Sequence, residues 1–203
     1  MSAPDEISRF AEALGIDLPP GAPEQLEGYA SLLSSRGPAL GLVAQSDAGR
    51  VLERHVLDSL RAVRAVVPSD RVAYDLGSGG GLPGVPVAIA VRELSVTLVE
   101  SRRLRASWLE LVVEELGLAN SRVVHGRIED LTGPADLCLA RALGPLERSW
   151  ELARGLLAPK GRLVYFAGER FDPGQHRGIH EQIRILDESG LESRGPLVII
   201  GRQ

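Results

Sequence analysis

The chain has 203 residues, of which 44% are hydrophobic, and its formal net charge at pH 7 is −4. A chain of this length can bury one sizeable core with a small appendage, but hardly two full domains. The single cysteine excludes an internal disulfide framework and a cysteine-rich zinc site, and the acidic balance excludes a protein that holds nucleic acid by charge alone.

The apolar windows of the sequence are short, and its N-terminus is polar. The stretch GVPVAIAV (84–91) is far shorter than the ~20 residues that a membrane span needs. The first ten residues, MSAPDEISRF, lack the basic and apolar parts of a secretion signal. We therefore expect a cytoplasmic, monomeric protein with no membrane partner and no metal.

The first seventy residues have the pattern of a helical lead-in. Apolar residues recur at helical spacing over 7–14, 26–33 and 51–67, with LPPGAP between the first two runs and Gly37-Pro38 after the second. Residues 1–70 carry ten acids and six bases, whereas residues 71–203 carry seventeen of each. We predict a small acidic helical extension over residues 1–70, whose charge fits a solvated outer face.

From residue 71 onward, short β-branched runs alternate with helical patterns. The runs RVAYDL, SVTLVE, SRVVHG, ADLCLA and GRLVYFAG predict strands, and residues 84–92, 103–116 and 145–157 predict helices. This alternation is typical of an α/β domain with a parallel sheet and helices on both faces. The last two runs, EQIRILDES and PLVIIGR, are joined only by SGLESRG, which is too short for a parallel crossover. We therefore predict that residues 71–203 form a mostly parallel sheet closed by an antiparallel hairpin.

A glycine-rich loop follows the first predicted strand, in VAYDLGSGGGLPGVPVAIA (72–90). Ligands of such sheets bind beyond the carboxyl ends of the strands. Gly77, Gly79 and Gly81 can adopt unusual backbone angles and allow a ligand to approach closely. Pro83 and Pro86 suit the first turn of a helix, where their missing N–H groups have no partner anyway. The loop therefore predicts a ligand site at the start of a helix.

Three ligand classes use such loops. A phosphate-cradling loop needs Lys and Ser/Thr after its last glycine, where this chain has Val85 and proline. A dinucleotide loop counted from Gly77 has Leu82 in place of its third glycine, and counted from Gly79 it starts two residues late. The pattern D-x-G-x-G-x-G, which begins at Asp75, matches the S-adenosylmethionine loop of Rossmann-like methyltransferases in full.

Further candidate ligand contacts follow the second and third strands. Glu100 ends the second strand, where a carboxylate can accept both hydroxyl groups of an adenosine ribose. Ile128 and Glu129 follow the third strand, in positions suited to an apolar wall and to an acceptor for the adenine amino group. A solvated strand-end acid at Glu100 and a solvated turn at Glu129 with Asp130 stay open as alternatives.

At this point the chain resembles a known family, the glucose-inhibited division protein B group of bacterial methyltransferases that modify a guanine N7 in 16S ribosomal RNA. The likeness runs from about residue 26 to the C-terminus. It is carried by ERHVLDSL (53–60), DLGSGGGLPGVPVAI (75–89) with its Leu-Pro-Gly-x-Pro tail, LVES (98–101), RIED (127–130) and ARAL (140–143).

The resemblance implies a class I methyltransferase fold with a seven-stranded sheet, S-adenosyl-L-methionine as cofactor, and 16S ribosomal RNA or a small-subunit particle as partner. By similarity, Gly77, Leu82, Ile128, Glu129 and Arg141 contact the cofactor. With the loop and strand-end residues, the predicted cofactor site comprises Asp75, Gly77, Ser78, Gly79, Gly81, Leu82, Glu100, Ile128, Glu129 and Arg141.

The chain departs from the family pattern at three places. Gly41-Leu42-Val43 stands where the family usually has Asn-Leu-Thr, Leu104-Arg105 where it has Lys-Arg, and Phe166-Ala167-Gly168 where it has Leu-Lys-Gly. These positions are expected to face the RNA or the target base. The resemblance therefore covers the residues of the cofactor site more completely than those of the acceptor site.

Methylation at guanine N7 needs no general base, because N7 carries a lone pair and no proton. Alignment alone supplies effective molarities of ~10⁵–10⁸ M. Arg141, which follows the fourth strand, is the candidate for holding both the cofactor and the incoming base. The alternative is an arginine paired with a structural acid such as Asp136 or Glu147.

The remaining candidates for the acceptor side are two residues of the lead-in and a basic cluster. His55 and Asp58 lie three apart on one face of a predicted helix, where they either brace the domain against the lead-in or line the acceptor entrance. Arg102, Arg103 and Arg105 either grip phosphates or form a solvated helix start.

Three other functions stay open on the sequence alone. A diverged methyltransferase of another RNA or of a small molecule fits the altered polar residues. A non-catalytic, ribosome-associated protein that binds S-adenosylmethionine fits the loop equally well, and a nicotinamide oxidoreductase shares the acid after the second strand.

Overall fold

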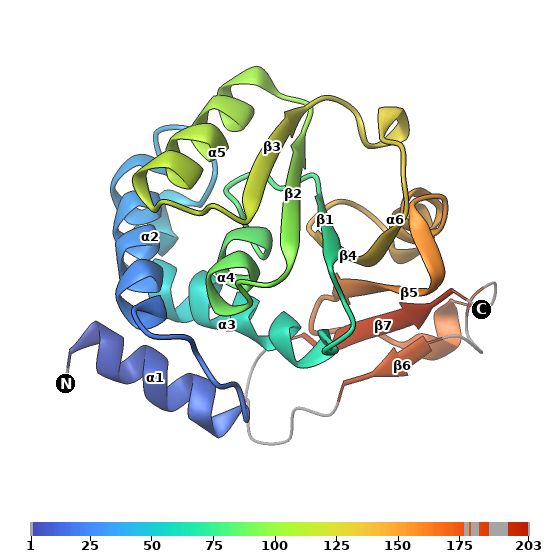
Figure 1. The fold of residues 1–203 in the computed structure, drawn as a ribbon, viewed down its shortest axis with the longest axis horizontal. Coiled ribbons are helices and arrows are strands. Elements are labelled where there is room, and N and C mark those ends of the chain that lie inside the picture. The colour runs from blue at the N-terminus through green and yellow to red at the C-terminus, as the bar shows by residue number, and fades with distance from the viewer. Residues whose placement is uncertain (1, 177–178, 180–182, 187–194, 203) are drawn as a thin grey trace.

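A single sheet of seven strands organises the chain, as the computed structural model shows for residues 2–176, 179, 183–186 and 195–202. The strands are β1 (Val72–Leu76), β2 (Ser95–Glu100), β3 (Ser121–His125), β4 (Ala135–Arg141), β5 (Leu157–Phe166), β6 (Ile183–Ile185) and β7 (Leu197–Gly201). Their order is β3-β2-β1-β4-β5-β7-β6 (Figure 1). The predicted strands are confirmed.

The first five strands are parallel, and β7 runs antiparallel to both β5 and β6. The predicted antiparallel hairpin at the end of the sheet is therefore confirmed. Of the linking segment SGLESRG (189–195), only Gly195 lies within the described residues. The mostly parallel α/β sheet that the sequence predicts is the observed architecture.

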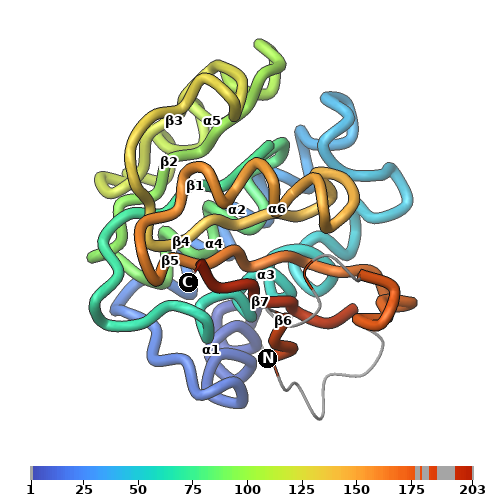
Figure 2. Tube along the Cα trace, turned by 90° about the vertical axis from the view of Figure 1, so that its right-hand side faces the viewer, coloured from blue at the N-terminus to red at the C-terminus, as the bar shows by residue number. Residues whose placement is uncertain are grey.

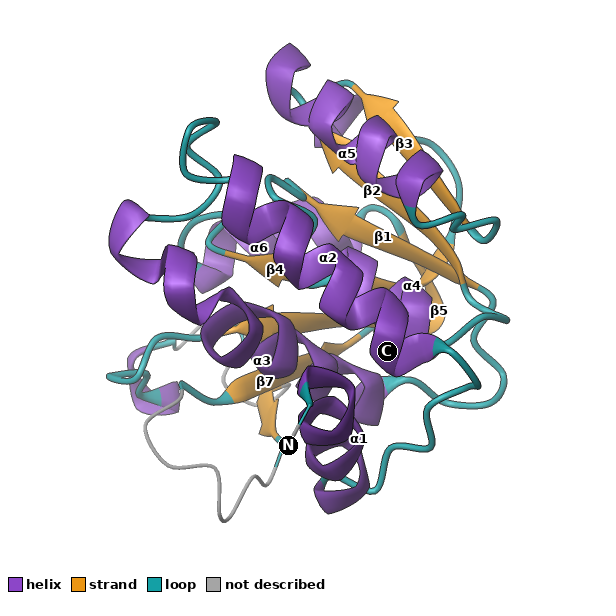
Figure 3. Ribbon diagram, turned by 90° about the vertical axis from the view of Figure 1, so that its left-hand side faces the viewer, coloured by secondary structure: helices purple, strands orange, loops and turns teal. Residues whose placement is uncertain are grey.

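Helices cover both faces of the sheet, unequally. They are α1 (Ala3–Ala13), α2 (Ala22–Arg36), α3 (Leu57–Leu60), α4 (Gly84–Ala90), α5 (Arg103–Glu115) and α6 (Leu146–Arg154). Figure 3 looks onto the face covered by α1 to α5, and Figure 2 shows α6 on the opposite face. Among the described residues, no helix is long and apolar enough to cross a membrane.

The third predicted helix, over 51–67, is broken into short pieces. A π-helical turn covers Leu52–Val56, α3 follows, and a 3-10 turn covers Arg61–Ala65. The Ser59 hydroxyl donates to the carbonyl of His55 at 2.7 Å, so a side chain competes with the regular backbone bonds here. The first two predicted helices are confirmed, and α2 ends at Gly37 as expected.

The lead-in and the sheet share one hydrophobic core. Ile7, Leu26 and Leu33 are fully buried in the same cluster as Leu98 of β2 and Leu109 of α5. A second cluster on the other face gathers around α6. Because they share this core, the lead-in and the sheet form one folded unit. The predicted boundary at residue 70 between an extension and a second domain stays a prediction.

The glycine-rich loop after β1 is held by two aromatic side chains from different helices. Tyr29 of α2 donates its hydroxyl to the carbonyl of Gly80 at 2.8 Å, and the indole N–H of Trp108 of α5 donates to the same oxygen at 2.9 Å. Both side chains are buried. The lead-in therefore fixes the loop directly, because α2 supplies one of the two donors.

Replacing Tyr29 by Phe should lower the free energy of unfolding by about 1 kcal/mol, because the Gly80 carbonyl keeps its bond from Trp108. The double variant with Trp108→Phe should lose more than the sum of the two single changes, because it leaves the buried carbonyl unpaired. Urea denaturation of the four proteins measures both values. Strict additivity would contradict the shared role of this carbonyl.

Candidate functional site

The predicted site residues meet at the carboxyl edge of the sheet. Asp75 of β1 lies in register with Leu98 of β2 and with Leu139 of β4. The loop after β1, the acid at the end of β2 and the arginine at the end of β4 therefore lie on neighbouring strand ends, as the parallel topology requires.

Asp75 is a buried carboxyl group with one oxygen unused by the protein. Its side chain is 1% exposed, and Oδ2 accepts the backbone N–H of Gly84 at 3.2 Å. Oδ1 is buried and has no hydrogen-bond partner among the described residues. Burial raises the pKa of this carboxyl to about 7, against the bonds from Ser78 and Gly84 that lower it. A buried acceptor without a donor is costly, and it fits a bound ligand that brings one.

Glu100 connects the loop to the start of α5. Its carboxylate accepts the backbone N–H of Gly79 at 3.1 Å and that of Arg102 at 2.8 Å. The residue is 5% exposed, so the alternative of a solvated strand-end acid is wrong. Each oxygen retains a lone pair, and a ribose role for Glu100 stays a prediction.

The glycines of the loop allow neighbouring side chains to pack closely against the backbone, and one of them also leaves room for a ligand. At Gly77, an added Cβ would lie 2.8 Å from Cδ1 of Leu143, and at Gly81 it would lie 2.7 Å from Val85. At Gly79 the neighbouring atoms lie 3.8 Å away or farther. All three have positive φ angles of 56° to 102°, which only glycine adopts without strain. Gly79 is thus the loop position most open to a ligand.

The segment after β3 forms a short 3-10 turn, Ile128–Asp130, beside the same edge. Ile128 packs against the second apolar cluster. Glu129 pairs with Arg148 at 2.9 Å and lies 3.7 Å from Arg127. Its pKa is lowered, first by its own backbone N–H and then by these cations. The exposed position of Glu129 is compatible with a solvated turn and with a role as acceptor for the adenine amino group. The second role stays a prediction.

Arg141 is clamped at the end of β4 by the lead-in. Nη2 lies 2.9 Å from Oδ2 of Asp58, Nη1 donates to Ser59 Oγ at 3.1 Å, and the guanidinium lies 5.3 Å from the centre of the Phe166 ring. The alternative considered from the sequence, that Arg141 pairs with Asp136 or Glu147, is therefore wrong, because the acid that pairs with Arg141 is Asp58. Asp136 accepts the backbone amides that begin β1, and Glu147 pairs with His176.

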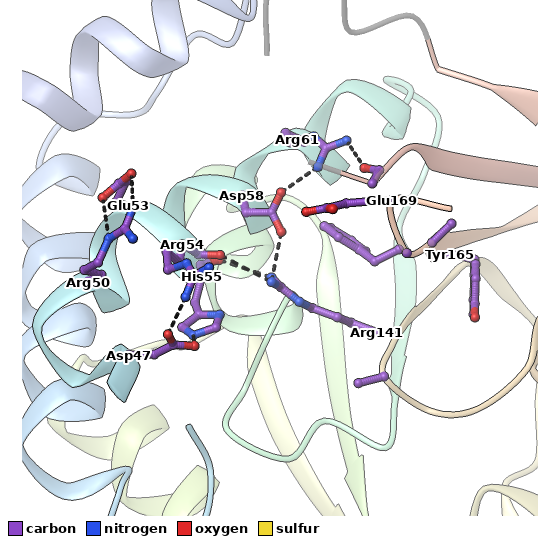
Figure 4. Close-up of a pocket in the computed structure, with 15 residues that line it drawn as sticks. Asp47, Arg50, Glu53, Arg54, His55, Asp58, Arg61, Arg141, Tyr165 and Glu169 are labelled. Atoms are coloured by element: carbon purple, nitrogen blue, oxygen red, sulfur yellow. Dashed lines mark hydrogen bonds and ion pairs between the residues drawn. The ribbon is translucent and has the colours of Figure 1, made fainter. Parts of the chain in front are cut away.

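A polar cavity of about 800 Å³ opens next to Arg141, on the side of β5 (Figure 4). Its walls come from residues 47–61 of the lead-in, from the ends of β4 and β5, and from Gly195 ahead of β7. Ala142, at its edge, has a φ of 53°, a strained angle for alanine that turns the chain toward Leu143. We call this the acceptor cavity. Its lining includes Arg141 of the predicted cofactor site but none of residues 75–84, and Leu143, which follows Ala142, lies against Gly77.

The predicted pair His55 and Asp58 lines this cavity. His55 Nε2 lies 3.2 Å from Asp47, and burial first, then Arg141, lower the pKa of the imidazole. Asp58 also pairs with Arg61 at 2.5 Å, and Arg61 donates to the carbonyl of Gly195 at 2.8 Å. Asp58 thus braces the lead-in against β4 and borders the cavity, and its role at the acceptor entrance stays a prediction.

The predicted basic cluster lies at the start of α5, outside the acceptor cavity. Arg102 and Arg103 are exposed, and Arg105 donates to the carbonyl of Gly41 at 3.1 Å. The departures at Gly41 and Leu104 thus lie beside this cluster, and Leu104 is 76% exposed. A phosphate-binding role stays a prediction for all three arginines.

The sequence reasoning missed several residues of the cavity. Asp47 and Arg54 form an ion pair at 2.5 Å, Arg50 pairs with Glu53 at 2.9 Å, and Glu169 follows β5. Its position in the sequence could have indicated Glu169 as a site residue, because it lies three residues beyond the fifth strand and next to the Phe166-Ala167-Gly168 departure. The pairs in the lead-in are local, and the i,i+3 spacing of Arg50 and Glu53 could have indicated one of them.

Comparison with known proteins gives a consistent result. The family model for rRNA small subunit methyltransferase G (GidB) matches residues 22–179. A protein of Halorhodospira halophila named ribosomal RNA small subunit methyltransferase G is 38% identical, covering 90% of this chain and 83% of its own. The protein of the same name from Ralstonia nicotianae is 36% identical, covering 96% of this chain and 93% of its own.

Solved structures with a similar fold are distant in sequence. The crystal structure of M. jannaschii TYW2 in complex with AdoMet is similar with a TM-score of 0.53 and 12% identity, covering 73% of this chain and 74% of that one. This likeness concerns the fold alone.

Asp75 should make stability fall as pH rises. Between the ordinary pKa of 3.8 and a pKa of about 7, the unfolded chain releases the Asp75 proton while the folded chain keeps it. The contribution of this carboxyl group to the free energy of unfolding is therefore full below pH 3.8 and is lost as pH rises through about 7. At ~1.4 kcal/mol per pKa unit, the wild type should lose on the order of 3 kcal/mol between pH 5 and pH 8 relative to Asp75→Asn. Urea denaturation across this range tests it, and parallel curves for the two proteins would contradict it.

Replacing Asp58 by Asn should lower the free energy of unfolding by about 3 kcal/mol, because the charge of Arg61, which is 1% exposed, would lose the Asp58 carboxylate that now pairs with it. The matched control is Glu53→Gln, which removes a carboxylate from an exposed pair and should cost less than about 1 kcal/mol. Equal losses in the two variants, measured by denaturant unfolding, would refute the buried clamp.

Proposed function

Because the chain belongs to the rRNA small subunit methyltransferase G family, we propose that it transfers a methyl group from S-adenosylmethionine to N7 of a guanine in 16S ribosomal RNA. The observation that carries the proposal is the family match over residues 22–179, which includes the complete acid-and-glycine loop and the arginine at the end of β4.

The chemistry that the cofactor supplies is an electrophilic methyl group on a sulfonium. The residues at the carboxyl edge of the sheet fit its nucleoside part. Gly79 leaves an open backbone approach, Glu100 offers lone pairs for ribose hydroxyls, and Asp75 holds a buried acceptor that needs a donor. Ile128 and Leu82 are the apolar neighbours proposed for the adenine.

The task left to the protein is to orient the base and exclude water. Guanine N7 is already a nucleophile, so a proton acceptor is not required for attack. Arg141 is suited to positioning, since Asp58, Ser59 and the Phe166 ring hold its guanidinium in the wall of the acceptor cavity. Placement of this kind supplies most of the acceleration in a transfer with a reactive donor.

The acceptor is proposed to enter through the acceptor cavity, with the exposed arginines at the start of α5 near the RNA backbone. The chain has no strongly basic face by composition, so phosphate contacts are expected to be few, and recognition relies on the shape of the RNA or of the particle. Monomeric state and cytoplasmic location stay predictions.

Mass mapping of 16S ribosomal RNA from a deletion strain tests the function. We expect one guanine to lose its N7 methyl group and to regain it when the gene is restored. Unchanged methylation would contradict the proposed acceptor. Tight binding of S-adenosylhomocysteine without methyl transfer to rRNA or small-subunit particles would favour a non-catalytic protein instead.

Replacing Glu100 by Gln should weaken S-adenosylhomocysteine binding at least about tenfold, because an amide N–H₂ would then face one of the two backbone donors and disturb the loop. Calorimetry on the variant measures this. Glu110→Gln, an exposed change on α5, is the control and should bind like the wild type. Wild-type affinity in Glu100→Gln would place the cofactor elsewhere.

A further inference from the structure

The acceptor cavity contains one carboxylate that forms no hydrogen bond or ion pair with the described part of the chain. Four acids and four arginines line the cavity. Three of the acids are in ion pairs, since Asp47 pairs with Arg54, Glu53 with Arg50, and Asp58 with both Arg61 and Arg141. The fourth, Glu169, has no hydrogen bond or ion pair to any residue that the structure describes.

The position of Glu169 relates it directly to Arg141. In the sheet, Arg141 at the end of β4 lies in register with Phe166 at the end of β5, and Glu169 follows three residues later. In Figure 4 the Glu169 carboxylate points into the cavity, on the side of Asp58 and Arg61. The cavity thus presents the guanidinium of Arg141 and the carboxylate of Glu169 from two neighbouring strand ends.

The Glu169 carboxylate matches the edge of one nucleobase. Around the edge of guanine the polar groups follow in the order N7, O6, N1–H and N2–H₂. A carboxylate accepts hydrogen bonds and donates none. It can therefore accept from N1–H and N2–H₂ together, whereas adenine, cytosine and uracil each turn at least one acceptor lone pair toward a carboxylate on the corresponding edge.

We infer that Glu169 is a specificity-determining residue that reads the N1–H and N2–H₂ edge of the target guanine, in the cavity that Arg141 also lines. This inference rests on the proposed function and names the recognition within its acceptor cavity. Enzymes that modify a base outside the stack commonly read its Watson–Crick edge in this way.

The test compares Glu169→Gln with the wild type in two assays. In methyl transfer to 16S rRNA and to small-subunit particles, kcat/KM should fall about 10- to 100-fold, while the Kd for S-adenosylhomocysteine stays within twofold. Because Glu169 is exposed and makes no contact with another polar group of the described chain, the variant should unfold like the wild type.

The second assay measures recognition without catalysis. Binding of guanosine, inosine and adenosine monophosphates to the complex with S-adenosylhomocysteine is followed by ligand-observed NMR. The wild type should prefer guanosine monophosphate over the inosine compound, which lacks the N2 amino group, and over the adenosine compound. Glu169→Gln should lose this preference, and Glu169→Asp should retain part of it.

Glu151→Gln provides the matched control, because it makes the same chemical change on α6 outside the acceptor cavity and should leave both assays unchanged. If Glu169→Gln keeps the guanine preference, or falls in activity only as far as Glu151→Gln, the assignment is overturned. Wild-type protein that transfers no methyl group would contradict the proposed function, and the nucleotide preference would still decide the role of Glu169.

Discussion

The carboxylate of Asp58 is the contact on which the arrangement of this edge depends. It lies between two arginines, one from its own helical segment and one from the end of β4, and through Arg61 it reaches the carbonyl of Gly195 ahead of β7. Three stretches far apart in the sequence are thereby tied at one point. A buried pair of this kind gives little net stability, but the loss of one member is costly, so it favours a unique arrangement over alternatives.

The elements of the sheet and the principal ligand loop could be predicted from the sequence because their signals are local. β-branched runs specify strands, and the acid two residues before Gly77 distinguishes this loop from nucleotide loops. The end hairpin followed from the length of its connection alone. The helix expected over 51–67 was the exception, because Ser59 bonds to the carbonyl of His55 and a π-helical turn replaces regular backbone spacing.

The acceptor side was less predictable, for a physical reason. Its groups interact across the fold: the partner of Arg141 is Asp58, 83 positions earlier in the chain, and no pattern near β4 indicates it. Likewise, Glu169 becomes a candidate for ligand binding only when the structure shows that the other acids of the cavity are in ion pairs. A carboxylate without a partner is a property of the folded cavity and not of any local motif.

The position of Trp108 has a practical consequence for spectroscopy. Its indole is bonded to the backbone of the glycine-rich loop, whereas Trp150, the other tryptophan, is a buried residue of α6 on the opposite face of the sheet. The chain thus carries one intrinsic fluorophore attached to the loop and a second that serves as an internal reference. Emission changes on ligand addition would report motion of the loop without any label.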